Sequence, residues 1–375
     1  VPKGSHLGKP GSNRTGYSAG YRTTQGGSLP AGILANHHAN NPRDSRANFQ
    51  EVEPVNRPNP PLAIDRFQFP RIGLIVAIFA AIGIPFGLVF WAGWQEVVQA
   101  MGSIGVIAII AALLTSLSNY FLRFARWQYF MKALGHSVPW RHNLQIYFSG
   151  LALTATPGKA GELVRGLFLK PYGVSYARSF VLFFWDRLSD LAGVLLLAVT
   201  AGGLLASGYQ SLLPGVLVVL FLLWLLRPGG PLFMRTLLML EDHLSRRARV
   251  HLRTLIRLRH VDTRLTLPLA LKGVTAGTLA YAAHGIGLYI MAQAAGVPLE
   301  LAAAILVVTV STLMGAVVLM PGGVGMVELT SVVLLSAQGV PEADAVALGL
   351  VHRFTTFWFA IGLGAGCLIP LIRRR

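Results

Sequence analysis

Long apolar stretches without a charged residue are the feature of this sequence that most restricts its fold. Residues 72–91 and 101–122 contain no Asp, Glu, Lys or Arg. A helix of about 20 residues crosses the hydrocarbon core of a bilayer, which is about 30 Å thick. The chain is 53% hydrophobic and only 13% charged, whereas soluble domains carry about 25% charged residues. The sequence therefore predicts an all-α polytopic membrane protein.

Six apolar stretches are long enough to be full transmembrane helices, namely residues 72–91, 101–122, 177–205, 211–226, 268–294 and 345–369. Two further apolar regions, residues 144–169 and 300–337, are interrupted near the middle by Pro-Gly. Irregular backbone at membrane depth is tolerated only where it is buried in protein or lines a water-filled cavity. We therefore interpret both regions as re-entrant helical hairpins with Pro-Gly at their tips.

The distribution of basic residues predicts which connections face the cytoplasm. Residues 227–267 hold nine arginines against three acidic residues, and residues 123–142 and both chain ends are also basic. The positive-inside rule places all of these in the cytoplasm, at the plasma (inner) membrane. Counting crossings then makes the first hairpin enter from the cytoplasm and the second from the outside. The net charge of +17 is explained by orientation, so we expect no nucleic-acid partner.

The first part of the chain differs in composition from the rest. Residues 1–66 are rich in Gly, Ser, Asn, Pro and Arg and show no apolar periodicity. Such a segment cannot bury enough apolar surface to fold. We expect a disordered basic tail over residues 1–66 and a transmembrane domain over residues 67–375.

The two Pro-Gly regions also share a spacing that indicates an internal repeat. Glu162 precedes Arg187 by 25 residues, and Glu328 precedes Arg353 by 25. The predicted topology gives the two copies opposite orientations in the membrane. The copies are expected over residues 101–205 and 268–370. Inverted repeats with broken helices that meet near the membrane midplane are typical of secondary transporters.

Four sequence motifs carry a family resemblance. "TPGKAGELVR", "WDRLSD", "MPGGVGMVE" and a late "HR" resemble the flippase-like membrane domain of lysylphosphatidylglycerol synthases, over about residues 70–372. The resemblance implies movement of an aminoacylated or otherwise modified lipid between leaflets. A separate soluble domain makes the lipid in that family, and here only "PLIRRR" follows residue 369. We therefore expect no aminoacyl transfer by this chain alone, and a separate lipid synthase is a candidate partner.

Ionisable residues within the apolar regions are the candidate site, because charge in a bilayer is costly and usually marks a partner or a substrate pathway. The candidate substrate-binding residues are Pro157, Gly158, Lys159, Glu162, Arg165, Asp186, Arg187, Asp190, Pro321, Gly322, Gly323, Glu328, His352 and Arg353. His352, like His284, is expected to be a hydrogen-bonded core residue rather than a metal ligand.

Each charged group has a structural and a functional interpretation. Glu162 and Arg165 are spaced for an i, i+3 pair, whereas Arg165 or Lys159 could instead meet a lipid phosphate. The arginines at positions 187 and 353 are expected to reach the glutamate of the opposite hairpin. We favour phosphate binding by these two arginines, because guanidinium binds phosphodiesters in a bidentate manner and helix N-termini after the Pro-Gly turns would favour an anion.

Asp186 and Asp190 lie at i, i+4. A proton or metal site is one interpretation, but we expect them to neutralise Arg187 or Arg165.

Three classes of function are compatible with these patterns. A lipid flippase or transporter for an anionic or modified lipid agrees best with the hairpins and the repeat. The alternatives are an intramembrane lipid-modifying enzyme and an accessory subunit of an aminoacyl-lipid, hopanoid or polyprenyl-sugar pathway. The sequence contains no P-loop, nucleotide motif or Cys/His cluster, so neither a cofactor nor a metal is expected. The sequence does not indicate an oligomeric state.

Overall fold

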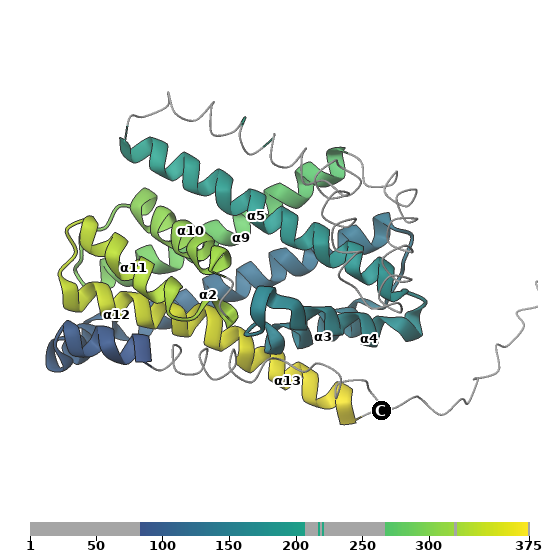
Figure 1. The fold of residues 1–375 in the computed structure, drawn as a ribbon, viewed down its shortest axis with the longest axis horizontal. Coiled ribbons are helices and arrows are strands. Elements are labelled where there is room, and N and C mark those ends of the chain that lie inside the picture. The colour runs from purple at the N-terminus through teal and green to yellow at the C-terminus, as the bar shows by residue number, and fades with distance from the viewer. Residues whose placement is uncertain (1–82, 207–216, 218–219, 221–266, 319–320, 374–375) are drawn as a thin grey trace, which may run out of the picture. The chain divides into compact units, whose positions relative to one another are not determined.

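The computed structural model describes residues 83–206, 217, 220, 267–318 and 321–373, without the side chains of residues 157–160, 177, 267 and 321. Within these ranges every regular element is helical (Figure 1). The prediction of an all-α fold is therefore confirmed. The predicted tail, the loop 227–267 apart from its last residue, and nearly all of the span 211–226 lie outside the described residues, as does most of the span 72–91.

Three helical stretches in the described part of the chain are long and apolar enough to cross a bilayer, judged by length and composition: Trp94–Ala133, Arg178–Ala206 and Glu342–Arg373. They coincide with the predicted spans 101–122, 177–205 and 345–369. Helix α9 (Leu267–Ala294) has 28 residues and coincides with the predicted span 268–294. It is not among the three, since Lys272, His284 and several glycines lower its apolar character.

Helix α2 (Trp94–Ala133) is much longer than the predicted span. It contains 40 residues and is interrupted only at Gly105, whose φ of 70° is open to glycine. The helix therefore continues through residues 123–133, which the sequence analysis assigned to a cytoplasmic connection. Arg123 and Arg126 therefore do not belong to a connection, because they lie within α2 and both side chains are buried inside the protein.

The two interrupted regions form broken helical hairpins. The first contains α3 (Trp140–Ser149), the 3-10 segments η2 (Gly150–Leu153) and η3 (Pro157–Val164), and the short α4 (Arg165–Leu169). Helices α10 (Leu301–Val317) and α11 (Met326–Ala337) flank η7 (Pro321–Gly323) in the second.

The hairpins approach each other from opposite ends. In Figure 1, α3 and α4 lie at one end of the helical domain, and α10 and α11 lie at the other. Their irregular segments η3 and η7 are in contact. A Cβ built on Gly322 would lie 3.4 Å from the Cα of Ala155. The two interruptions therefore meet inside the domain.

Matching turns follow the two hairpins. Gly173 and Gly339 both have positive φ, 76° and 83°. The next residue in each case is a buried valine whose N–H donates to the preceding helix, from Val174 to Leu169 O and from Val340 to Leu335 O. These are the bonds of a glycine-terminated helix end. Helix α5 (Tyr176–Ala206) and helix α12 (Glu342–Arg353) each begin three residues after the glycine.

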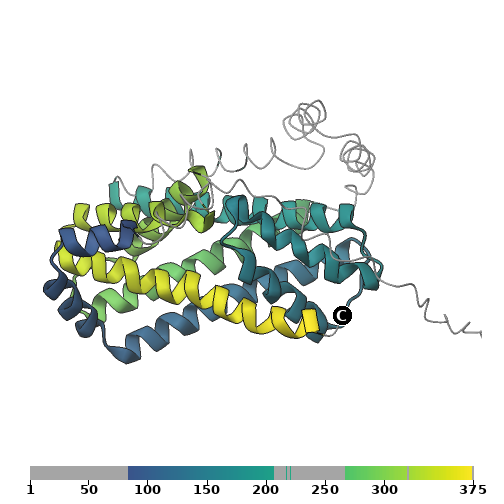
Figure 2. The same cartoon turned by 60° about the horizontal axis from the view of Figure 1, so that its bottom comes forward.

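Two apolar clusters build the core. One cluster joins the first half of α2 to the C-terminal end of α9 and to helices α10, α11 and α12. The other cluster joins the second half of α2 to helices α3, α4, α5 and α13 (Phe359–Arg373). Figure 2 shows α13 running along one face of the helical domain. Each hairpin thus has its own apolar surroundings, and the charged residues described next lie around the region where the hairpins meet.

Candidate functional site

Seven charged side chains form one network around the first hairpin, which we call the arginine–carboxylate cluster. Its members are Arg123 and Arg126 of α2, Glu162 and Arg165 of the hairpin, and Asp186, Arg187 and Asp190 of α5. Apart from Arg187, these side chains are at most 7% exposed. Buried charges need direct partners because they have lost their hydration.

The α2 arginines hold the two aspartates of α5. Arg126 donates through Nε to Asp186 at 3.0 Å and through a terminal nitrogen to Asp190 at 2.7 Å. Arg123 donates to the second oxygen of Asp190 at 2.9 Å. The i, i+3 spacing of the arginines matches the i, i+4 spacing of the aspartates, so both pairs lie on facing helix surfaces. The aspartates were expected to neutralise Arg187 or Arg165; they pair with Arg187, whereas Arg165 pairs with Glu162.

Arg165 is held by its own hairpin. A terminal nitrogen lies 2.9 Å from Glu162, and Nε donates to the carbonyl of Tyr147 at 3.1 Å. Its guanidinium also stacks on the Tyr147 ring, 4.0 Å from the centroid, and faces Trp127 at 5.4 Å. The i, i+3 pair is therefore confirmed. These contacts fix Arg165 inside the hairpin, where its side chain is only 1% exposed.

Arg187 joins the cluster from the side where the hairpins meet. Its terminal nitrogen lies 2.6 Å from Asp186, 3.1 Å from Asp190 and 3.5 Å from Glu162. Its side chain is 19% exposed, more than any other member. Arg187 is thus the cluster residue best placed to contact a bound molecule.

The second hairpin has a simpler counterpart. Arg353 donates through Nε to Glu328 at 2.9 Å and through a terminal nitrogen to the carbonyl of Gly322. The other oxygen of Glu328 accepts the N–H of Gly325 at 2.7 Å. The Glu328 carboxylate therefore binds the N-cap amide at the start of α11, where the sequence analysis expected a free helix N-terminus. The segment after Pro157 is a 3-10 helix, so it does not begin the α-helix that was expected there.

The pairing of Arg187 and Arg353 differs from the prediction. Each was expected to reach the glutamate of the opposite hairpin, but each contacts the glutamate of its own hairpin. The reason is geometric, because the helix that follows each hairpin packs beside it and brings an arginine against the preceding glutamate.

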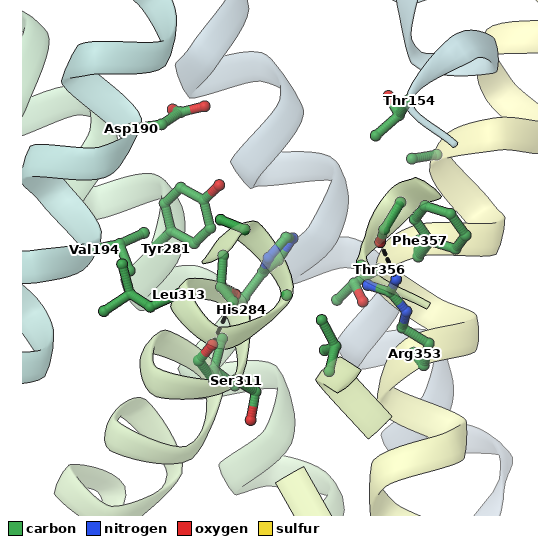
Figure 3. A pocket seen from close by; sticks show the side chains of 18 of the residues that line it. Thr154, Asp190, Val194, Tyr281, His284, Ser311, Leu313, Arg353, Thr356 and Phe357 are labelled. Atoms are coloured by element: carbon green, nitrogen blue, oxygen red, sulfur yellow. Dashed lines mark hydrogen bonds between the residues drawn. The ribbon is translucent and has the colours of Figure 1, made fainter. Parts of the chain in front are cut away.

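A cavity of about 380 Å³ lies between the two hairpins. Arg187 and Asp190 line it from α5, Thr154 and Thr156 from the first hairpin, and Gly322, Gly323, His352 and Arg353 from the second half of the chain. Figure 3 shows Asp190 and Tyr281 on one side of the cavity, with Thr154 and Arg353 across from them. Its remaining walls are largely apolar, with valines and leucines from α5, α9 and α10.

Aromatic and imidazole groups complete one wall of the cavity. His352 and His284 both line it, and His352 Nε2 lies 3.2 Å from the carbonyl of His284. The expectation that both are core residues agrees with this contact. The Tyr120 hydroxyl donates to the carbonyl of Thr356, within a π-helical turn at Phe354–Trp358. Such turns free a backbone carbonyl and are frequent at functional sites.

The structure separates the predicted site residues into groups. Arg187, Asp190, Gly322, Gly323, His352 and Arg353 line the cavity, and Glu162, Arg165, Asp186 and Glu328 support it from behind. Pro157, Gly158 and Lys159 belong to η3, and Pro321 begins η7. The side chains of Pro157, Lys159 and Pro321 lie outside what the structure describes. The described residues include no group of three metal-ligating side chains suited to a metal ion.

Sequence reasoning missed Arg123, Arg126, Tyr281 and Ser311. The two arginines were read as loop charges. Their i, i+3 spacing inside an unbroken helical pattern, opposite an Asp-x-x-x-Asp pair, was the signal that could have placed them. Nothing in the sequence distinguishes Tyr281 or Ser311 from other residues of apolar helices.

An all-helical chain with membrane-length apolar helices, broken hairpins and buried charge defines an integral membrane protein. The model of the lysylphosphatidylglycerol synthase TM region matches residues 72–364, and the chain belongs to this family. The chain is 24% identical to a UPF0104 membrane protein of Pyrococcus horikoshii over 309 residues, which cover 74% of this chain and 91% of the relative. Two UPF0104 membrane proteins of Methanothermobacter thermautotrophicus are 24% and 23% identical, covering 81% and 79% of this chain and 92% and 94% of those relatives.

Proposed function

We propose that the protein moves an anionic or otherwise modified lipid between the leaflets of the membrane. The observation that carries this proposal is a cavity between two broken hairpins into which Arg187 and Arg353 project. A phosphate ester is the anionic group that all phospholipids share, and the guanidinium fork binds phosphate oxygens through two parallel hydrogen bonds.

The balance of buried charge supports an anionic ligand. Arg353 and the four arginines of the arginine–carboxylate cluster face four carboxylates, those of Glu162, Asp186, Asp190 and Glu328. One positive charge therefore remains in excess among the described members of these two groups. An uncompensated charge inside a membrane protein is costly, and such charges usually face a partner or a pathway. A lipid phosphate entering the cavity would supply the missing negative charge.

The arrangement of the hairpins suggests how the lipid is passed on. The matching spacings and the matching turns at Gly173 and Gly339 support an inverted repeat. In transporters of that kind the two repeats rock against each other and expose a midplane site to one side at a time. With both termini in the cytoplasm of the inner membrane, the first hairpin would gate the cytoplasmic side and the second the outer side. A separate lipid synthase would provide the substrate.

The test is lipid translocation in reconstituted vesicles. The protein is placed in phosphatidylcholine vesicles that contain a trace of phosphatidylglycerol labelled on an acyl chain, and dithionite quenching reports how fast inner-leaflet lipid reaches the outside. We expect translocation by the wild type and a loss of at least tenfold in Arg353→Gln. Lys272→Gln is the control, because this exposed lysine contacts Tyr129 away from the cavity.

A double variant separates a binding role from a structural one. Removing Arg353 alone leaves Glu328 buried without its guanidinium, which itself costs about 3–5 kcal/mol. Glu328→Gln with Arg353→Gln removes both charges, and the amide oxygen can still accept the Gly325 N–H. If the pair is only a structural bridge, the double variant regains translocation. That result would contradict phosphate binding by Arg353, whereas continued inactivity with a normal folded yield supports it.

A further inference from the structure

We infer that the surface at the end of the first hairpin binds the headgroups of anionic membrane lipids. This surface, which we call the hairpin rim, lies at the start of α3, in the 3-10 segment η4 (Lys170–Tyr172) and at the start of α5. Its residues are Trp140, Arg141, Lys170, Tyr172, Tyr176 and Arg178. None of them is among the residues that line the cavity. Lipid binding at the rim requires no translocation, so the inference is independent of the proposed function.

Side-chain contacts join the rim into one patch. The ring of Tyr172 packs against His142 of α3, with 6.2 Å between the ring centroids. The ammonium of Lys170 lies 5.7 Å from the centroid of the Tyr176 ring. These contacts connect η4 to the start of α3 and to the start of α5. The rim is therefore a surface with a fixed arrangement of basic and aromatic side chains.

The basic residues of the rim have no carboxylate partner in the described part of the chain. Arg141 and Lys170 are exposed, and Arg178 is half-buried with a terminal nitrogen 3.3 Å from His136 Nε2. The carboxylates inside the domain are paired with buried arginines. The remaining described carboxylates belong to Glu96, Glu300, Glu342 and Asp344.

Those four acidic residues lie at the opposite end of the domain. Their neighbours Val97, Leu299 and Val340 pack together in the apolar cluster of α10, α11 and α12. In Figure 1 these helices lie at the end away from α3 and α4. The loop 227–267 holds nine arginines against three acidic residues, so its sequence brings no surplus of carboxylates. The negative charge that balances the rim must therefore come from outside the described chain.

The rim also lies at the depth of lipid headgroups. The membrane-length part of α5 begins at Arg178, so the start of this helix marks the boundary of the hydrocarbon core. Trp140 is 60% and Tyr176 49% exposed. Exposed Trp and Tyr side chains at this boundary place their rings among the headgroups. The guanidinium of Arg141 lies 5.6 Å from the Trp140 ring centroid, which holds it at the same depth.

These observations favour a lipid over an acidic soluble protein as the partner. Long basic side chains at a helix end extend toward the phosphate groups of the interface. A soluble partner would have to displace lipid from the exposed aromatic rings. Orientation by the positive-inside rule requires only basic residues in the connections. The pairing of basic with aromatic residues and the missing carboxylates point further, to an anionic ligand at headgroup depth.

The test measures which lipid contacts the rim in a bilayer. In a Cys367→Ser background, a bimane label on Ser137→Cys reports beside the rim, and one on Gln338→Cys reports at the acidic end; both positions are exposed. The protein is placed in nanodiscs of phosphatidylcholine and phosphatidylglycerol in fixed proportion. Either the first or the second lipid is brominated on an acyl chain near the glycerol. The ratio of the two quenching values gives the local preference for phosphatidylglycerol.

We expect a preference of about fivefold at Ser137→Cys, from about 1 kcal/mol for each basic residue near an anionic surface. At Gln338→Cys we expect no preference. Arg141→Gln with Lys170→Gln should reduce the preference at the rim to below about twofold, and raising the ionic strength should weaken it. Glu300→Gln with Glu342→Gln is the matched control, because it also neutralises two exposed charges and should leave the rim preference unchanged.

Three results would overturn the inference: equal quenching by the two lipids at Ser137→Cys, the same preference at both labelled positions, or a full preference in the Arg141→Gln, Lys170→Gln variant. Each of them would leave the proposed function standing, and a rim preference in protein that translocates no lipid would leave this inference standing. A preference of a few fold requires the high lipid concentration of a bilayer. In detergent the rim is expected to be empty, which separates it from the cavity.

Discussion

The close approach of α5 and α9 beside the arginine–carboxylate cluster gives a stability prediction for Gly193→Ala. A Cβ built on Gly193 would lie 2.5 Å from the backbone nitrogen of Thr278 and 2.7 Å from the carbonyl carbon of Gly277. Ordinary contacts at a Cβ begin near 3.4 Å. Because both neighbours are backbone atoms, no side chain can rotate away. The helices must therefore separate by several tenths of an ångström.

The expected cost of that separation is about 1–3 kcal/mol, the usual range for overpacking. Gly202→Ala in the same helix is the matched control, because its Cβ would meet only Leu306, at 3.6 Å. Without a clash, replacing a helical glycine with alanine is neutral or stabilises by about 0.5–1 kcal/mol. The two variants make the same chemical change, so the difference between them reports packing.

Thermal unfolding of the purified protein in detergent, followed by tryptophan fluorescence, measures this difference. We expect a Tm at least several degrees lower for Gly193→Ala than for Gly202→Ala, from about 2–4 °C per kcal/mol. Lipid translocation should fall as well, since Asp190 lies one turn before Gly193 and would move away from α2. Equal Tm values for the two variants would refute the close helix packing.

Three further predictions concern the orientation of the chain in the membrane, the contacts of Arg165, and Gly322 at the tip of the second hairpin. In a Cys367→Ser background, single cysteines placed in the loop 227–267 should react only from the cytoplasmic side; labelling from outside would refute the charge-based orientation. Arg165→Lys keeps the positive charge but loses the stacking on Tyr147 and the planar guanidinium that binds two acceptors at once. The free energy of unfolding should therefore fall by about 2–4 kcal/mol, and the Tm should fall with it. An unchanged Tm would contradict a stabilising role for the Arg165 contacts. Gly322→Ala, whose Cβ would strike Phe357, should reduce translocation far more than Gly296→Ala. Gly296 also has positive φ but faces open space, so equal effects would show that backbone strain alone is responsible.

The helical class and the interrupted hairpins could be predicted because they follow from local chemistry. Apolar length fixes a membrane helix, and Pro-Gly inside an apolar region breaks one. The pair of Glu162 with Arg165 was also predictable, because i, i+3 neighbours share a helix face.

The partners of the buried charges could not be predicted in the same way, because they depend on which helices pack together. The positive-inside rule assigns Arg123 to a cytoplasmic loop. Only the packing of α2 on α5 shows that Arg123 binds Asp190. Likewise, the position of Arg353 along its helix would allow contact with the glutamate of either hairpin. Its contact with Glu328 follows from the way α12 packs beside its own hairpin.

The measurement that tests the central claim most directly is native mass spectrometry of the protein purified in mild detergent from its membrane. The claim is that the arginine-bearing cavity holds a phosphate-containing lipid. We predict one bound phospholipid, present in the wild type and in Lys272→Gln and lost in Arg353→Gln. Retention of the same lipid by folded Arg353→Gln, or the absence of any phosphate-containing lipid from the wild type, would contradict the account.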